Sequence, residues 1–253
     1  MSLVDQVVAH VLQLEVSLYH ASARLDSGTD SEALHDLRIS VRRLRSLLRP
    51  LRGSRGVDAL DETASRVGDL TTPVRDLEVL AGELRARGFH AAAENREQSL
   101  AGHYRAVQRS AELRDLFVGL DLWPQGIRSA ERVGELDDWH KRLSKGLHKQ
   151  QLRLQDALQD ADHDPHRLRL LVKRNRYAAE AYPKHSPLSS RQGKLLKAAQ
   201  SALGSWHDRH QWCLQAGEHK DLQPLLNDWS AEGAQALQDA ESKLQALAAS
   251  FKG

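Results

Sequence analysis

Two segments of this chain carry histidine, arginine and lysine at a spacing that suits anion binding. Residues 35–45 read HDLRISVRRLR and residues 166–176 read HRLRLLVKRNR, so the pattern recurs at an offset of 131 residues. Intervals of three, four and three residues place the matched side chains on one face of an α-helix. We name these faces stripe 1, which comprises His35, Arg38, Arg42, Arg45 and Arg49, and stripe 2, which comprises His166, Arg169, Lys173 and Arg176.

Helical-wheel geometry places the stripes at the edge of the core-facing side of each helix. At about 100° per residue, stripe 1 falls within an arc of roughly 80°. The neighbouring arc holds apolar residues, namely Leu37, Val41, Leu44 and Leu48. Charges at such a boundary line a groove between helices, whereas charges opposite the core are simply solvated. We therefore expect a basic groove, and Arg43 and Arg174, which lie off the stripes, are weaker candidates.

The residue types favour phosphate as the anion. The planar arginine guanidinium offers five donors that suit phosphate oxygens, and side chains seven residues apart lie roughly 10 Å apart along the helix. His35 and His166 sit near the predicted helix starts. The helix dipole there favours anions and disfavours imidazolium, so we expect both histidines to act as neutral donors. An extended, repeatedly charged polyanion matches this arrangement.

The competing interpretation of each basic segment is an ordinary solvent-exposed helix whose charges form ion pairs with one another. Against it, the segment 37–57 holds seven arginines and no acidic residue, and the pattern occurs twice. Glu180 stands where stripe 1 has Arg49, so the N-terminal half is expected to contribute more charge. Lysines that could complete a ring, although each alone is more typical of a solvated face, are Lys141, Lys145, Lys149, Lys194 and Lys197.

The segments that position the stripes are all predicted to be α-helices. Alternating β-branched runs are missing and aromatic residues are sparse. Asp164-Pro165 predicts the start of the stripe 2 helix, and Thr29-x-x-Glu32 resembles a capping box before the stripe 1 helix. Two prolines should end these helices, Pro50 and Pro183. The expected helices span about 2–25, 31–50, 57–70, 74–88, 91–109, 129–160, 165–182, 190–203, 206–217 and 220–250.

A second matched pair extends the repeat. TTPVRD at 71–76 aligns with LGSWHD at 203–208, at an offset of 132 residues. Two ordered pairs predict a duplicated helical unit, with repeats at about 1–120 and 129–253. The halves should meet in a turn-rich connection near 118–130, where the sequence reads GLDLWPQG. Two packed bundles with approximate two-fold symmetry would follow, and one continuous core is the alternative.

Composition restricts the class of protein. The net charge is +2, so any functional positive charge must be local. The single cysteine, Cys213, excludes an intramolecular disulfide and is compatible with a reducing cytosol. No uncharged apolar run approaches the roughly 18 residues needed to span a membrane, and the N-terminus lacks the uninterrupted apolar segment of a signal peptide. We expect a soluble cytoplasmic protein.

Catalytic patterns are weak. The sequence lacks His-Glu-x-x-His, Cys-x-x-Cys and a glycine-rich phosphate loop, so we expect no metal and no cofactor. His207 and His210 could share a metal, but no third ligand is evident. Asp76 and Asp208 could be bases in metal-dependent polyphosphate or triphosphate hydrolysis. The favoured alternative is that each accepts hydrogen bonds from a helix N-terminus or an arginine and so fixes a turn. A binding protein is favoured over an enzyme.

Nucleic-acid binding is the second alternative. Single-strand binders interleave basic residues with exposed aromatic rings, but the first basic segment has no aromatic residue and the second ends at Tyr177. Tryptophans that recur among apolar residues are predicted to be core, namely Trp206, Trp212 and Trp229. Duplex recognition would turn the arginine face outward, away from neighbouring helices. Nucleic acid is therefore the less favoured partner.

At these residues the chain resembles the CHAD family of α-helical domains. The family pattern His-x-x-Arg-x-x-x-Arg-Arg-Leu-Arg is similar to residues 35–45, and its second form, which ends in Arg-Tyr-x-x-Glu, is similar to 166–180. The family's Leu-Gly-x-x-Arg-Asp is similar to 71–76 and 203–208. The resemblance covers essentially the whole chain as one domain, 1–253. It implies an all-α fold of two pseudo-symmetric four-helix bundles around a basic central groove or cavity.

The resemblance also implies binding of inorganic polyphosphate and association with polyphosphate granules. The chain departs from the family pattern at Thr71-Thr72, Asn175 and His207, which we expect to affect packing and connecting turns more than the basic face. The expected function is non-catalytic polyphosphate binding, with the arginines and lysine of the stripes on phosphate and with His35 and His166 as positioning donors.

Overall fold

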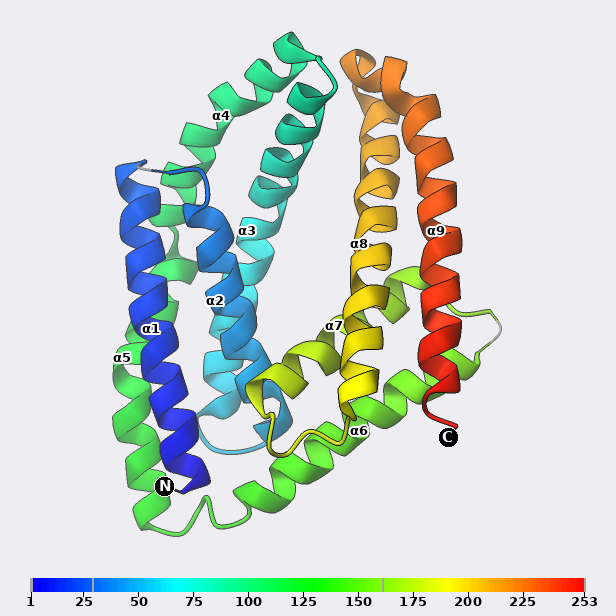
Figure 1. The fold of residues 1–253 in the computed structure, drawn as a ribbon. Coiled ribbons are helices and arrows are strands. Elements are labelled where there is room, and N and C mark those ends of the chain that lie inside the picture. The colour runs from blue at the N-terminus through cyan, green and yellow to red at the C-terminus, as the bar shows by residue number, and fades with distance from the viewer. Residues whose placement is uncertain (1, 29, 161, 253) are drawn as a thin grey trace. The chain divides into compact units, whose positions relative to one another are not determined.

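The chain folds into α-helices joined by short connections (Figure 1). The computed structural model describes residues 2–28, 30–160 and 162–252, and across these ranges no β-strand occurs. The predicted all-α class is confirmed. The chain divides into two compact units, which we call unit 1 (Met1–Leu143) and unit 2 (Ser144–Gly253). None of the described helices is both long enough and apolar enough to cross a membrane.

Unit 1 carries stripe 1. Its elements are α1 (Leu3–Ser27), α2 (Ala33–Leu48), the 3₁₀ turn η1 (Arg49–Leu51), α3 (Val57–Ala86), α4 (His90–Gln108), α5 (Ala111–Arg132) and the first turn of α6 (Trp139–Gln159). Helix α2 packs against α1 and α3, and α3 also packs against α4 and α5. The described part of unit 1 therefore holds five long helices, one more than the four-helix bundle that the resemblance implied.

Unit 2 carries stripe 2. Its elements are the rest of α6, α7 (Pro165–Ala181), α8 (Ser190–Glu218), the 3₁₀ segment η2 (Lys220–Leu225) and α9 (Leu226–Ala249). Helices α8 and α9 lie side by side, and α7 packs against α8 (Figure 1). Helices α6 to α9 share one apolar core, whose larger members include Leu154, Leu168, Val172, Leu196, Leu203, Trp206 and Leu244. The three tryptophans predicted to be core are buried.

The helix ends beside the stripes follow the predicted signals. The Asp164 carboxylate accepts hydrogen bonds from the backbone N–H groups of His166 and Arg167, at 2.9 and 3.2 Å, and so caps α7. Helix α7 ends at Ala181, just before Pro183, and α2 gives way to η1 at Pro50. Thr29 lies outside the described residues, so the predicted capping box is not described. Helix α2 begins after Glu32, which makes no side-chain capping bond.

Two predicted helix breaks are wrong. Helix α3 runs through Pro73 without interruption, and α8 runs through 203–206. An interior proline costs about 3 kcal/mol because it removes a backbone hydrogen bond and crowds the preceding turn. In α3 that cost is offset by burial on both sides of the proline, where Val67 and Val74 are almost inaccessible. Tertiary packing therefore outweighs the local signal.

The predicted connection at 118–130 is also wrong. Gly119, Pro124 and Gly126 lie inside α5, and the link to α6 is the segment 133–138. The buried residues of α5 recur at helical spacing, as Leu113, Leu116, Leu120, Trp123 and Ile127. The Trp123 indole also donates to the Gly56 carbonyl at 3.0 Å. That apolar periodicity was present in the sequence and indicates the helix despite its glycines and proline.

Candidate functional site

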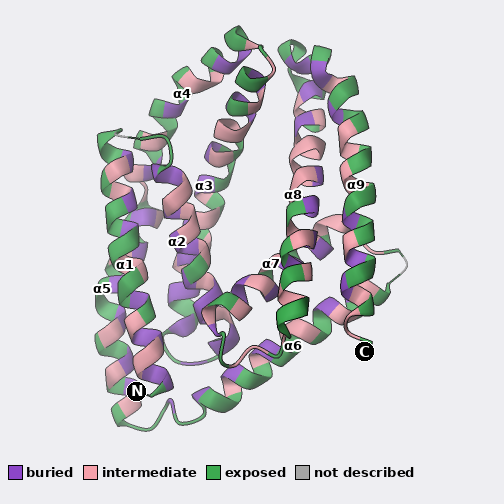
Figure 2. Ribbon diagram, in the orientation of Figure 1, coloured by how far each residue is buried: buried purple, intermediate pink, exposed green. Residues whose placement is uncertain are grey.

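The structure places both stripes at the edge of the buried side of their helices. Every member of the two stripes is partly buried, whereas Arg43 and Arg174 are exposed. Beside stripe 1, the apolar arc of α2 is at most 3% accessible. Figure 2 shows buried and exposed residues alternating in bands along the helices. The predicted boundary position is therefore observed, and the contact of these side chains with a ligand remains a prediction.

Arg38 is a cation held in place by neutral groups. From α2, its Nη1 donates to three oxygens of α3: the Gly68 carbonyl at 3.2 Å, Thr71 Oγ1 at 2.8 Å and Thr72 Oγ1 at 3.1 Å. Among the described residues Arg38 forms no ion pair. Burial, reinforced by nearby Arg42, lowers the pKa of Arg38, yet a guanidinium stays charged at neutral pH. The seam between α2 and α3 therefore presents an oriented positive charge.

Two of the departures from the family pattern belong to the basic face, whereas Asn175 is buried and donates to the Gln150 and Leu171 carbonyls. Thr71 and Thr72, which we expected to affect packing and turns, use their hydroxyls to hold Arg38. Both lie in the middle of α3, and so does Asp76, while Asp208 lies within α8. The expectation that these aspartates fix turns at a helix N-terminus is therefore wrong, because the landmark segments are helical throughout. That each accepts a hydrogen bond from an arginine stays a prediction.

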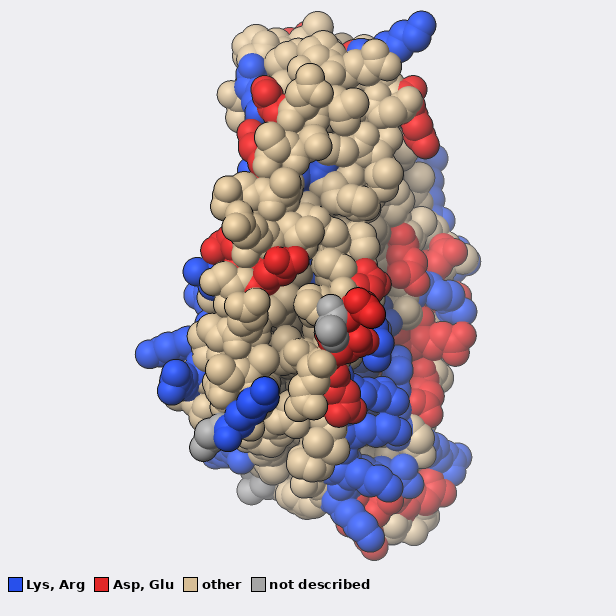
Figure 3. Space-filling model, turned by 90° about the vertical axis from the view of Figure 1, so that its right-hand side faces the viewer, with Lys and Arg blue, Asp and Glu red and all other residues tan. Residues whose placement is uncertain are grey.

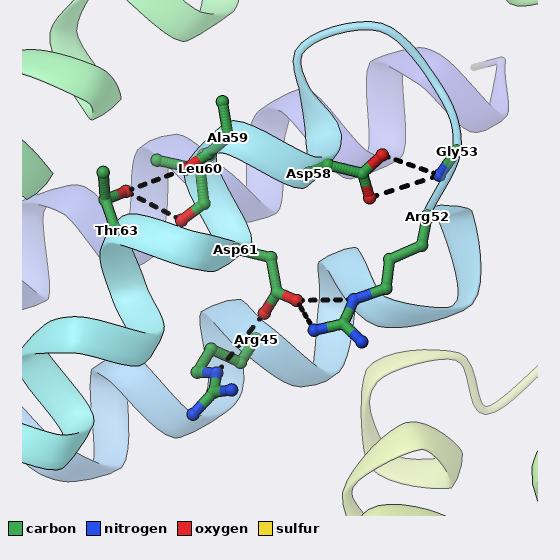
Figure 4. A network of polar contacts seen from close by, with 8 residues as sticks. All are labelled: Arg45, Arg52, Gly53, Asp58, Ala59, Leu60, Asp61 and Thr63. Atoms are coloured by element: carbon green, nitrogen blue, oxygen red, sulfur yellow. Dashed lines mark hydrogen bonds and ion pairs between the residues drawn. The ribbon is translucent and has the colours of Figure 1, made fainter.

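Arg45 is engaged by a buried carboxylate (Figure 4). Asp61 of α3 is 1% accessible, and its Oδ1 accepts from Arg45 Nε at 3.3 Å. Its Oδ2 accepts from Arg52 Nε at 2.7 Å, and also from Arg52 Nη2. The segment 37–57 contains no acidic residue, but folding brings one from just beyond it. The lack of a local acid therefore does not leave Arg45 unpaired.

The end of stripe 2 is similarly engaged. Arg176 donates to Gln200 Oε1 at 2.6 Å, pairs with Glu180 at 2.9 Å and lies over the ring of Tyr177 at 4.5 Å. Glu180, which matches Arg49 in the repeat, thus neutralises Arg176, the last cation of stripe 2. Stripe 1 has a comparable contact, between Arg45 and Asp61, so the lower net positive charge of stripe 2 stays a prediction.

Four rings gather at the start of stripe 2. The His166 ring lies 4.5 Å from Trp206, 5.1 Å from His210 and 5.4 Å from His207, measured between centroids. Burial, followed by the charge of Arg169 and of nearby basic groups, lowers the pKa of His207 to about 4. His207 is therefore neutral at pH 7. Sequence reasoning treated His207 and His210 only as a metal pair and missed their contact with His166, although their segment follows stripe 2 in the repeat.

The additional lysines differ from the stripes. They are exposed side chains of α6 and α8, namely Lys141, Lys145, Lys149, Lys194 and Lys197. On the face of the molecule in Figure 3, basic and acidic side chains gather next to one another at the lower right. Exposed charges such as those of the five lysines are strongly screened by solvent and salt. Within the described ranges, no three or more His, Cys, Asp or Glu residues are grouped so that they could hold a metal ion.

Comparisons with known proteins agree with this fold. The CHAD domain family profile matches residues 11–215. The crystal structure of the CHAD domain from the plant Ricinus communis is similar at a TM-score of 0.70 and 24% identity, covering 98% of this chain and 91% of the plant chain. PptA from Streptomyces chartreusis is similar at a TM-score of 0.55 and 18% identity, covering 96% and 99%. The search of curated proteins gave no match. Since the family profile covers most of its length, the chain belongs to the CHAD domain family.

Proposed function

We propose that this chain binds inorganic polyphosphate without cleaving it. One proposed contact surface is the seam where the stripe 1 helix packs against α3, and the other is the seam where the stripe 2 helix packs against α8. The observation that carries the proposal is Arg38, a partly buried cation that three neutral acceptors hold in position. Such a cation is oriented before a ligand arrives and keeps its charge available for an anion.

The arrangement of the stripes suits a chain of phosphates better than a single one. Members of a stripe seven residues apart are separated by roughly 10 Å along the axis, so one phosphate reaches only part of a stripe. Partial burial strengthens each charge–phosphate interaction because the surroundings are less polar than water. Successive phosphates of an extended chain can then contact successive side chains.

The carboxylates placed against the stripes favour binding over hydrolysis. Metal-assisted cleavage of a phosphoanhydride uses carboxylates that hold divalent cations. Here Asp61 and Glu180 are both engaged by arginines of the stripes or their neighbours. Of the two other carboxylates whose charge acts on Arg38, Asp76 and Glu78, Glu78 is likewise engaged, by Arg75 and Tyr104. Carboxylates held by arginines suit retention of the polyanion better than metal-assisted cleavage.

A competition titration at fixed ionic strength tests the proposal. Long-chain polyphosphate, tripolyphosphate, orthophosphate and single-stranded RNA are compared at equal phosphate concentration. Long chains should bind most tightly, and affinity should fall steeply with salt because bound counterions are released. Equal affinity for orthophosphate and long chains would refute the extended site, and equal affinity for RNA would favour nucleic acid. Shortening of the polyphosphate in the presence of Mg²⁺ or Mn²⁺ would show that the protein is an enzyme.

A matched pair of variants tests the role of Arg38. Arg38→Gln should weaken polyphosphate binding about tenfold or more, since a charged hydrogen bond contributes about 1.5–3 kcal/mol. Arg43→Gln removes an exposed arginine from the same helix and should change affinity by less than about threefold. Both variants should keep the helical circular dichroism of the wild type. Equal losses would show that net charge, and not the position of Arg38, governs binding.

A further inference from the structure

One pair of matched positions beside the stripes carries an ion pair in one half and two imidazoles in the other. In unit 1 the pair is Arg75 and Glu78, and at the offset of 132 residues unit 2 has His207 and His210. Arg75 Nη1 donates to Glu78 Oε2 at 2.8 Å, and the Tyr104 hydroxyl donates to Glu78 Oε1 at 2.6 Å. Unit 1 therefore places a fixed, neutralised ion pair where unit 2 places two imidazoles that can gain protons.

The two imidazoles form one cluster with stripe 2. His166, the first member of the stripe, contacts both rings, and Trp206 lies against His166 and stacks with His210 at 5.6 Å. Nδ1 of His207 is buried and, within the described chain, has no hydrogen-bond partner. A polar atom in that state costs free energy, and protonation would make both ring nitrogens donors for an incoming anion.

Charged groups face His207 from the helices packed around it. Those on α7 and α8 whose charge lowers the pKa of His207 are all basic or imidazole, namely His166, Arg169, Lys173 and His210. The acidic residue beside it on α8 is Asp208, which makes an interaction of its own. On helix α9, Glu232 pairs with Arg209 at 2.9 Å and Asp239 pairs with Lys243 at 3.3 Å, while Asp228 and Glu241 are exposed. The charged residues of η2, Lys220 and Asp221, lie beyond the far end of α8. In the absence of ligand these surroundings oppose a positive charge on His207.

We propose that polyphosphate binding at stripe 2 is coupled to proton uptake by the cluster of His166, His207 and His210, so that binding strengthens as pH falls. This inference rests on the proposed function. Phosphate oxygens beside Arg169 and Lys173 would offset the cations that oppose imidazolium and would accept hydrogen bonds from the protonated rings. By linkage, each proton taken up on binding raises the affinity for polyphosphate about tenfold for every unit by which the pH falls. Stripe 1 shares a histidine, His35, but its flanking pair is already neutralised.

Calorimetry on the full chain tests the coupling. Long-chain polyphosphate is titrated at pH 6.5 in two buffers with different ionisation enthalpies, which gives the number of protons taken up. The wild type is compared with His207→Asn plus His210→Asn and with His103→Asn, which removes an exposed histidine of α4 in unit 1. Titration of the polyphosphate itself is common to all three proteins and cancels.

The double variant should take up fewer protons than the wild type, and His103→Asn should not. From pH 8 to pH 6, wild-type affinity should rise at least about fivefold more than that of the double variant. His207→Arg with His210→Glu, which copies unit 1, should show the same loss of pH dependence. Equal proton uptake in all proteins would overturn the coupling while leaving polyphosphate binding intact.

Absence of wild-type binding at every pH would overturn the proposed function itself, and the coupling with it. If the variants do not fold, the imidazole resonances of the wild type provide the test. Their pKa values should rise when polyphosphate is added, and unchanged values would overturn the coupling.

Discussion

Replacement of Asp61 by asparagine should destabilise unit 1 without weakening polyphosphate binding. Asp61 is 1% accessible and joins Arg45 of α2 to Arg52 beyond η1 (Figure 4). Asparagine keeps the shape but loses the charge, so both arginines lose a buried anionic partner. The same change removes a negative charge from beside stripe 1, which leaves Arg45 more available to phosphate.

The size of the loss follows from the exposure of the two arginines. Breaking a buried ion pair costs about 3–5 kcal/mol when the remaining charge stays buried. Here the Arg45 and Arg52 side chains are 20% and 54% accessible, so both can recover part of their hydration. We therefore expect a loss of about 2–3 kcal/mol in the free energy of unfolding. For a chain of this size, that lowers Tm by about 5–10 °C.

Thermal and urea unfolding followed by circular dichroism measure this effect, with Asp58→Asn as the control. Asp58 lies one turn earlier in α3, is exposed and accepts from the Gly53 N–H, at 3.0 Å for its closer oxygen. The control should cost at most about 1 kcal/mol. If Asp61→Asn were no more destabilising than Asp58→Asn, the buried ion pair would contribute nothing to stability. If Asp61→Asn bound polyphosphate more weakly, the carboxylate would be positioning Arg45 for the ligand.

Two further predictions concern stability. Burial and nearby Asp121 raise the pKa of Glu15 from 4.5 to about 6, so the folded state holds this proton more tightly and wild-type stability falls as pH rises through that range. The Tm of Glu15→Gln relative to that of the wild type should therefore increase as pH rises from 4.5 to 7.5. A Tm difference that does not vary with pH would contradict the raised pKa of Glu15. Asp164→Ala should cost about 1 kcal/mol of unfolding free energy, because the first turn of α7 loses its cap. Exposed Asp162→Ala, the control, should unfold like the wild type, and equal losses would exclude a capping role.

Local sequence patterns correctly predicted the structural features that depend on residues a few positions apart in the sequence. The all-α class, the start of α7 at Asp164 and the edge position of both stripes follow from helical periodicity and capping, which act over three or four residues. The same periodicity correctly separated exposed Arg43 and Arg174 from the stripes. Local glycine and proline signals failed at Pro73 and Pro124, since burial along α3 and α5 outweighs them.

The amino-acid sequence by itself determined that two basic helical faces exist and which residues belong to them. Tertiary structure decided what each member of those faces touches. Arg38 meets Thr71, Arg45 meets Asp61 and His166 meets His207 only because α2 packs on α3 and α7 packs on α8. These partners lie beyond the range of helical periodicity, which relates residues three or four apart. Pairing at larger separations is set by how the apolar faces pack, and that packing determines which cations stay available to a polyanion.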